Sequence, residues 1–191
     1  MYLWHRINLI CGLTMVRQTI NIVSILVVIL GFVQCGAITE QLPTYDETTI
    51  VVQGDVAPDF TATLLDGDQV TLSELRGEVV LLILFSHTCP DCKALFDDLH
   101  DDMATINNLG VRVLAIARDG SEEQVRDYFE ANGYIIDAAA DPDRAIYNLY
   151  ATMYVPRCYL INTLGVVECA TVEYHQGDLE TLLSKMREIC D

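Results

Sequence analysis

The chain has few basic residues for its size. Of its 191 residues, 11 are lysine or arginine and 28 are aspartate or glutamate, so its formal net charge is −17. No cluster of lysine or arginine offsets this charge locally. Proteins that bind DNA or RNA present basic patches to the phosphate backbone, so we expect no nucleic acid partner.

Acidic residues are absent from the first 35 positions, which sets this segment apart from the rest of the chain. Its apolar core, residues 22–33, is short. A membrane-spanning helix needs about 20 apolar residues, whereas the core of a signal peptide has about 7–15. We therefore interpret residues 1–35 as a signal or lipoprotein-type targeting segment. Met15 is an alternative start, because a short cationic stretch with Arg17 separates it from the apolar core.

A cysteine, Cys35, closes the apolar core, as in a bacterial lipoprotein signal, although Gln34 stands where such signals prefer a small residue. Three outcomes stay open: lipidation at Cys35, which we favour, cleavage near Ala37, or an uncleaved anchor. Each of them places the domain outside the cytoplasm. We expect an exported protein of the cell envelope or periplasm that is tethered to the membrane through its N-terminus.

The rest of the chain divides into a linker and one domain. Residues 36–54 are polar and lack periodicity, which predicts a tether. In the domain, residues 55–191, the apolar run 79–85 predicts a strand covered on both faces, and the apolar stripe over 91–109 predicts a helix. Further predicted elements are hairpins over 60–72 and 158–172, a strand over 111–117, a helix opened by Ser121, a short helix from Asp141 to Tyr150 and a last helix opened by Asp178. This order predicts an α/β fold: a mixed central sheet with helices on both faces and an N-terminal β-hairpin extension.

Two cysteines three positions apart, Cys89 and Cys92, follow the predicted buried strand. Cys89 stands at the N-terminus of the predicted helix, where unpaired N–H groups and the helix dipole stabilise a thiolate. Cys92 lies one turn later on the apolar stripe, where burial favours the neutral thiol. We therefore predict that Cys89 attacks a substrate disulfide and that Cys92 resolves the mixed disulfide. Their redox-active disulfide needs no cofactor.

The neighbours of the pair are expected to modify its reactivity. These active-site modifiers are His87, Pro90 and Asp91. A carboxylate beside the pair disfavours the thiolate by like-charge repulsion, and His87 and Lys93 offset part of that effect. The chain lacks a second Cys-x-x-Cys, so we expect no metal site of the four-ligand zinc type.

These residues resemble the thioredoxin superfamily, specifically the exported TlpA/ResA-like redoxins, over about residues 55–189. The resemblance implies a thioredoxin-like fold, with Pro156 in the cis form beside the cysteine pair and the backbone of Val155 bonded to the substrate. It also implies that the substrates are protein thiols and disulfides, and that a membrane thiol protein donates or accepts electrons. The segments that carry it are Val56-Ala57-Pro58-Asp59-Phe60, residues 70–77, Cys89-Pro90-Asp91-Cys92 and Tyr154-Val155-Pro156.

Three positions depart from the family pattern. Thr88 stands where many thioredoxins have tryptophan, Ile83 stands where many have a buried acid, and Leu95 stands where some TlpA/ResA-like proteins have a carboxylate. The sequence therefore shows no general base for Cys92. Elsewhere, Cys158 and Cys169 face each other across the last hairpin if Ile161 pairs with Val166, and a register shifted by one separates them.

We therefore expect an enzyme, a protein thiol–disulfide oxidoreductase, acting as a reductase if the family resemblance holds. One alternative is a peroxiredoxin-like thiol peroxidase, because Ser86 precedes Cys89 by three positions. Another is a Sco-like, non-enzymatic metal-binding module that holds copper through Cys89, Cys92 and His175. A redox-inert scaffold also stays open, because the family's acidic residues are missing.

Overall fold

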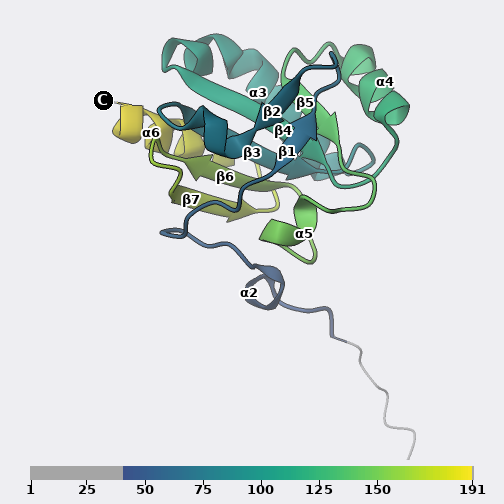
Figure 1. Ribbon diagram of the computed structural model, residues 1–191, viewed down its shortest axis with the longest axis horizontal. Coiled ribbons are helices and arrows are strands. Elements are labelled where there is room, and N and C mark those ends of the chain that lie inside the picture. Colours follow the sequence, from purple (N-terminus) through teal and green to yellow (C-terminus); the bar gives the residue numbers. More distant parts are fainter. Residues whose placement is uncertain (1–40, 191) are drawn as a thin grey trace, which may run out of the picture. The chain divides into compact units, whose positions relative to one another are not determined.

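The computed structural model describes residues 41–190 (Figure 1). The predicted targeting segment 1–35, with Met15 and Cys35, lies outside these residues. Residues 43–191 form one compact unit, which contains the domain. Among the described residues, no helix has both the length and the apolar character needed to cross a membrane.

The core of the domain is a five-stranded mixed sheet in the order β5-β4-β3-β6-β7. The central strand β3 is buried at every position, as its apolar sequence predicts. Strands β3, β4 and β5 pair in parallel, whereas β6 pairs antiparallel with both β3 and β7. The bounds are β3 Val79–Phe85, β4 Val111–Ala117, β5 Asp137–Ala140, β6 Arg157–Ile161 and β7 Val167–Val172.

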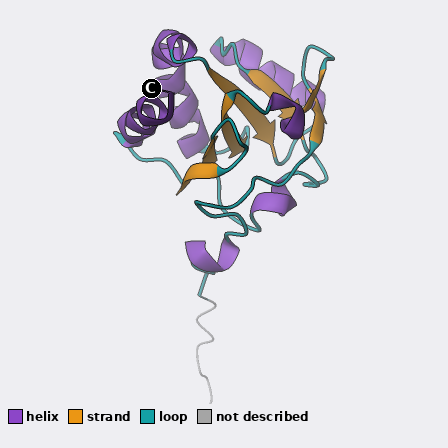
Figure 2. Cartoon of the chain, turned by 60° about the vertical axis from the view of Figure 1, so that its left-hand side comes forward, coloured by secondary structure: helices purple, strands orange, loops and turns teal. Residues whose placement is uncertain are grey.

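Helices cover both faces of the sheet, as predicted (Figure 2). Three helices share one face of the sheet: α3 (Pro90–Asn108), α4 (Glu122–Asn132) and α6 (Asp178–Cys190). Helix α3 packs against α6, and the ring centroids of Phe96 in α3 and Phe129 in α4 are 5.5 Å apart. Two successive right-handed crossovers in one direction produce that arrangement. The short helix α5 (Tyr147–Tyr150) lies on the other face, where the Tyr150 ring packs 5.1 Å from that of Tyr159.

The predicted N-terminal hairpin is present and flanks one edge of the sheet. Strands β1 (Thr61–Thr63) and β2 (Gln69–Thr71) pair antiparallel around the Asp66-Gly67 turn. A bridge from Leu64 to Ala139 attaches the hairpin to β5, and the short 3-10 helix η1 (Leu72–Leu75) leads on toward β3.

Residues 43–54, which fall within the predicted linker, belong to the same compact unit as the domain. A short helix, α2 (Tyr45–Thr48), opens with a capping box between Thr44 and Glu47. Next to it, Val51 is buried and donates a backbone hydrogen bond of 3.2 Å to the carbonyl of Tyr150. A four-residue helix with one buried residue leaves no apolar periodicity, so the sequence pattern could not reveal this element.

The region between α4 and β6 also differs from the prediction. The sequence Asp-Ala-Ala-Ala of β5 was missed because alanine and aspartate are both depleted in strands. The predicted helix from Asp141 to Tyr150 is helical only from Tyr147. Asp141 still acts as a cap at a distance, since its buried carboxylate accepts the N–H groups of Ile146 and Tyr147, the latter at 2.8 Å.

Candidate active site at the Cys89 and Cys92 pair

Cys89 is the N-cap residue of α3. Its backbone is extended, with φ −87° and ψ 122°, and Pro90 occupies the first helical turn. The cysteine makes no side-chain capping hydrogen bond, so the first N–H groups of the helix have no side-chain cap from it. The thiol is partly buried and donates a long hydrogen bond of 3.6 Å to the carbonyl of Val155.

Cys92 is fully buried one helical turn further on. Burial raises the pKa of its thiol well above the ordinary value, and a hydrogen bond from the backbone of Ser86 opposes that rise. The adjacent Cys89 and, more weakly, Cys158 raise the pKa of Cys92 further. The resting state of Cys92 is therefore a neutral thiol, while Cys89 lies at the surface of the same helix end.

The loop before β6 brings the other predicted residues to the pair. The Val155–Pro156 peptide bond is cis, as the family resemblance implies, and both residues are buried. The preceding residue, Tyr154, has a φ of 68°, in the left-handed region. Its carbonyl accepts a 2.8 Å hydrogen bond from the Tyr147 hydroxyl. The fold thus brings Val155 into contact with Cys89 across 66 positions of sequence.

A charged residue that the sequence reasoning missed, Asp119, lies beside the site. Its carboxylate is 3.4 Å from Nδ1 of His87, and both atoms are buried without a hydrogen bond of good geometry. Arg118 is 3.9 Å from the same carboxylate and donates to the Tyr147 hydroxyl at 3.2 Å. Asp119 could have been found from sequence, because the carboxyl ends of neighbouring parallel strands meet at one edge of a sheet.

The remaining predicted modifiers are exposed. Pro90 and Asp91 both face solvent in the first turn of α3. Lys93 was expected to offset the Asp91 charge, but its ammonium group forms a 2.7 Å ion pair with Asp97 one turn along the helix. Within the described part of the chain, Asp119 is therefore the charged residue that approaches the segment before Cys89, and it does so by its contact with His87.

Among residues 41–190, no carboxylate is among the groups that shift the pKa of Cys92, so none replaces the acids that many family members have and this chain lacks. Ile83 and Leu95 are both fully buried. Two other titratable groups interact electrostatically with Cys92. The Cys158 thiol raises the pKa of Cys92, and Cys92 raises the pKa of the Tyr128 hydroxyl. Burial raises the pKa of both groups, to about 12 in each case, so neither is a base at neutral pH.

Cys158 and Cys169 are not directly opposite each other. Ile161 pairs with Val167 rather than Val166, and an irregularity between Leu160 and Ile161 shifts the register by one more residue. Cys158 therefore pairs with Thr171, and Cys169 pairs with Leu160. Diagonal neighbours on antiparallel strands have Cβ atoms about 7–8 Å apart, too far for a disulfide without backbone movement. Cys158 instead lies opposite Ile83 of β3, beneath the active-site pair.

The residues of the copper-binding alternative are not gathered into a site. His175 is highly exposed and lies 3.5 Å from Asp178, at the start of α6. Within residues 41–190, no group of three or more His, Cys, Asp or Glu side chains is arranged to hold a metal ion. The described residues therefore offer Cys89 and Cys92 to thiol chemistry without a third ligand.

Comparison with known proteins gives three kinds of relative. A thiol-disulfide oxidoreductase ResA from Oceanobacillus iheyensis is 29% identical over 127 residues, covering 64% of this chain and 66% of that protein, just under two thirds. A protein of Mycobacterium tuberculosis named as a candidate peroxiredoxin is 26% identical over 134 residues, covering 70% of this chain and 85% of that protein.

Among solved structures, a candidate protein disulfide isomerase from Bacteroides thetaiotaomicron superposes with a TM-score of 0.71 and 31% sequence identity. The match covers 75% of this chain and 92% of that one. It confirms the predicted thioredoxin-like fold. Residues 53–170 match the AhpC/TSA family. The chain therefore belongs to the AhpC/TSA family, as a ResA-like member of the thioredoxin superfamily.

Proposed function

We propose that the protein is an extracytoplasmic thiol–disulfide oxidoreductase in which Cys89 is the nucleophile and Cys92 the resolving thiol. One observation carries this proposal: the partly exposed Cys89 occupies the N-cap position of α3 but makes no side-chain hydrogen bond there, while Cys92, one turn into the helix, is fully buried. Free N–H groups at a helix N-terminus stabilise a sulfur anion, whereas burial keeps a thiol protonated. The two sulfurs therefore differ in reactivity, as sequential attack and resolution require.

The reaction runs in two exchanges. The Cys89 thiolate attacks one sulfur of a substrate disulfide, which forms a mixed disulfide and releases the other sulfur as a thiolate. The released thiolate takes up the proton that Cys92 must lose, since no carboxylate adjoins Cys92 at the family's usual positions. Cys92 then attacks Cys89 and releases the second substrate sulfur. Two electrons and the Cys92 proton pass to the substrate, and the second substrate thiolate takes from solvent the proton that Cys89 gave up on ionising. The Cys89–Cys92 disulfide is the redox group that the reaction requires.

The substrate is held beside Cys89 by the loop that contains Val155 and Pro156. The Val155 carbonyl already accepts a hydrogen bond from the Cys89 thiol, so it lies within reach of whatever binds at that sulfur. An extended polypeptide can donate a backbone N–H to this carbonyl in place of the thiol. Protein disulfides are therefore the proposed substrates.

We propose reduction of disulfides as the direction, with a thiol protein of the membrane resupplying electrons. The ResA name of the relatives supports thiol–disulfide chemistry, and the acid-free N-terminal segment supports export. Anchoring through lipidated Cys35, or through an uncleaved signal segment, is part of the same proposal. It would hold the domain near its electron donor.

A second candidate function, thiol peroxidase activity, has one specific observation in its favour: relatives named as candidate peroxiredoxins match the chain as well as ResA proteins do. The geometry favours it less. The hydroxyl of Ser86, three positions before Cys89, hydrogen-bonds to Thr88 at 3.0 Å. Peroxide consumption with and without a dithiol reductant distinguishes the two activities.

The proposal is tested by measuring the reduction potential of the Cys89–Cys92 couple by thiol trapping across a glutathione series. A reductase should lie near about −270 mV, the thioredoxin range, and an oxidant near about −120 mV. The Cys92→Ser variant should accumulate a mixed disulfide through Cys89, whereas Cys89→Ser should not. The absence of a reversible couple would contradict the proposal.

A further inference from the structure

Arg157, the first residue of β6, is a fully buried cation directly after Pro156. Its donors are satisfied by neutral oxygens from two segments. One nitrogen donates to the Thr49 hydroxyl at 2.8 Å and another to the Thr48 hydroxyl at 2.9 Å. The guanidinium also donates twice to the carbonyl of Met153, at 2.8 and 3.0 Å. A buried guanidinium is tolerated only when its donors are satisfied, so the arginine joins these segments.

A second contact joins the same two segments at Tyr154, immediately before Val155. The Tyr154 hydroxyl donates to the carbonyl of Pro43 at 2.6 Å, and its ring packs edge-on against Tyr45 with centroids 5.0 Å apart. From the other side, the Tyr147 hydroxyl donates to the Tyr154 carbonyl. A non-glycine residue at a φ of 68° persists where its surroundings hold it, and these contacts do so.

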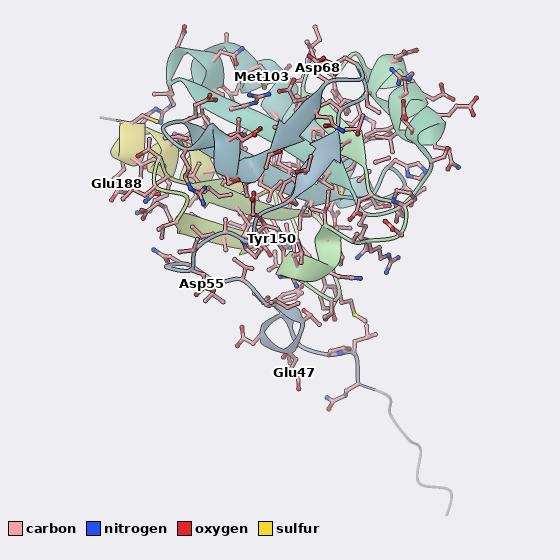
Figure 3. All side chains as sticks on the ribbon, in the orientation of Figure 1. Glu47, Asp55, Asp68, Met103, Tyr150 and Glu188 are labelled. Carbon is pink, nitrogen blue, oxygen red and sulfur yellow. The ribbon has the colours of Figure 1, made fainter. Side chains whose placement is uncertain are left out.

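A third contact reaches the loop through β7. The Tyr45 hydroxyl donates to the carboxylate of Glu173, and the Glu173 N–H donates to the Pro156 carbonyl at 2.8 Å. In the view of Figure 3, Tyr150 of α5 lies between Met103 of α3, at the top, and Glu47 of α2, at the bottom. The segment 43–51, here named the N-terminal strap, thus contacts the substrate-binding loop, residues 153–156, directly or through one residue.

These contacts converge on the residues that flank Val155. Met153, Tyr154 and Pro156 are each bonded to the strap or to its immediate partners, whereas the carbonyl of Val155 faces Cys89. Building on the proposed oxidoreductase function, we propose that the N-terminal strap sets the position of the substrate-binding loop. Tyr154 and Arg157 are then positioning residues for substrates that dock as an extended polypeptide, and small disulfides that need no docked backbone do not depend on them.

The test compares two disulfides, insulin and the small aromatic disulfide dithiobis-nitrobenzoate, in the full chain and its variants. Tyr154→Phe removes the hydrogen bond to Pro43 and keeps the ring. We expect it to raise KM for insulin about fivefold, the factor that corresponds to one hydrogen bond. The kcat for insulin, the rate with the small disulfide and the Cys89–Cys92 reduction potential should stay unchanged. Arg157→Met should raise the insulin KM further, because it removes several donors.

Tyr134→Phe is the matched control. It also deletes one tyrosine hydroxyl, which donates to Asp97 of α3 at 2.5 Å, on the face of the sheet that α3 covers, and its insulin KM should equal that of the native protein. A Tyr154→Phe variant with the native insulin KM, or with equal losses for both disulfides, would overturn the inference, and this result decides the matter even if Arg157→Met fails to fold. A native protein that exchanges neither disulfide would instead refute the proposed function.

Discussion

Two strand–helix junctions lie side by side at the carboxyl edge of the sheet, and they begin their helices differently. Residues 118–121 lead from β4 into α4, where the Ser121 hydroxyl accepts the Gln124 N–H and the Gln124 side chain accepts the Ser121 N–H. Residues 86–89 lead from β3 into α3, where Cys89 makes no capping bond. The same local topology thus gives a helix start with a side-chain cap in one case and a helix start without one in the other.

The difference shows that the end of α3 lacks the stabilisation that a capping side chain provides. A capping serine contributes about 1 kcal/mol to stability by satisfying an N–H group that otherwise lacks a partner. At the start of α3, no side chain caps the corresponding N–H group, so it can interact with the Cys89 thiolate. Stability at this helix end is therefore lower, and the free N–H groups can stabilise the thiolate of Cys89.

The largest expected effect comes from giving α3 the same kind of cap as α4. Cys89→Ser removes the proposed nucleophile, so disulfide reduction should fall to the rate of the uncatalysed exchange. Insulin reduction with excess dithiol measures this, and Cys169→Ser is the control, since that thiol lies in β7 and should retain full activity. Residual turnover by Cys89→Ser above the background rate would show that another thiol is the nucleophile.

The buried thiols beneath the junction predict a pH dependence of stability. Burial raises the pKa of both Cys92 and Cys158 above the ordinary value of 9.0, so the folded state keeps protons that the unfolded state loses. Their stabilising contribution is complete below about pH 9 and is lost as the pH rises toward the folded-state pKa. The free energy of unfolding should fall by up to about 1.4 kcal/mol per pH unit for each thiol.

Urea unfolding of the reduced protein between about pH 8 and pH 11 measures this slope. The Cys158→Ala variant should show a shallower decline, because one of the two thiols is gone while the buried tyrosines are unchanged. Identical slopes in the variant and the native protein would mean that the pKa of Cys158 is the same in the folded and unfolded states.

The two junctions should respond oppositely to exchange of their caps. Cys89→Ser should raise the free energy of unfolding by about 1 kcal/mol, and Ser121→Ala should lower it by about 1 kcal/mol. Thermal and urea unfolding at neutral pH measure both changes. Equal destabilisation by the two substitutions would show that the Cys89 side chain already stabilises the end of α3.

The smallest expected effect comes from breaking the link between the junctions. Asp119→Asn removes the carboxylate that lies 3.4 Å from His87. Since both side chains are partly exposed, the loss should be at most about 1 kcal/mol in the free energy of unfolding. Arg112→Met, which breaks a partly exposed pair with Asp137 at the other end of β4, is the comparison. A much larger loss for Asp119→Asn would mean that the link holds the β3–α3 junction in place.

Much of this fold follows from local patterns. The bounds of β3 and β4 agree with their apolar runs, and α3 begins within one residue of the predicted start. The capping box at Ser121 and the position of Cys89 also came from spacing alone. The missed elements are those whose residues have weak intrinsic preferences, the alanine-rich β5 and the four-residue α2, and the predicted α5 is shorter than expected.

The sequence by itself determined the layered α/β architecture and predicts the chemistry of the cysteine pair, because apolar periodicity and a helix N-terminus act over a few neighbouring residues. Only the tertiary structure decided what surrounds the pair. The contact of Cys89 with Val155, the approach of Asp119 to His87 and the burial of Arg157 against the strap join residues 32 to 109 positions apart. Such contacts depend on strand order and pairing register, and the β6–β7 register, which differs from the Ile161–Val166 pairing, separates Cys158 from Cys169.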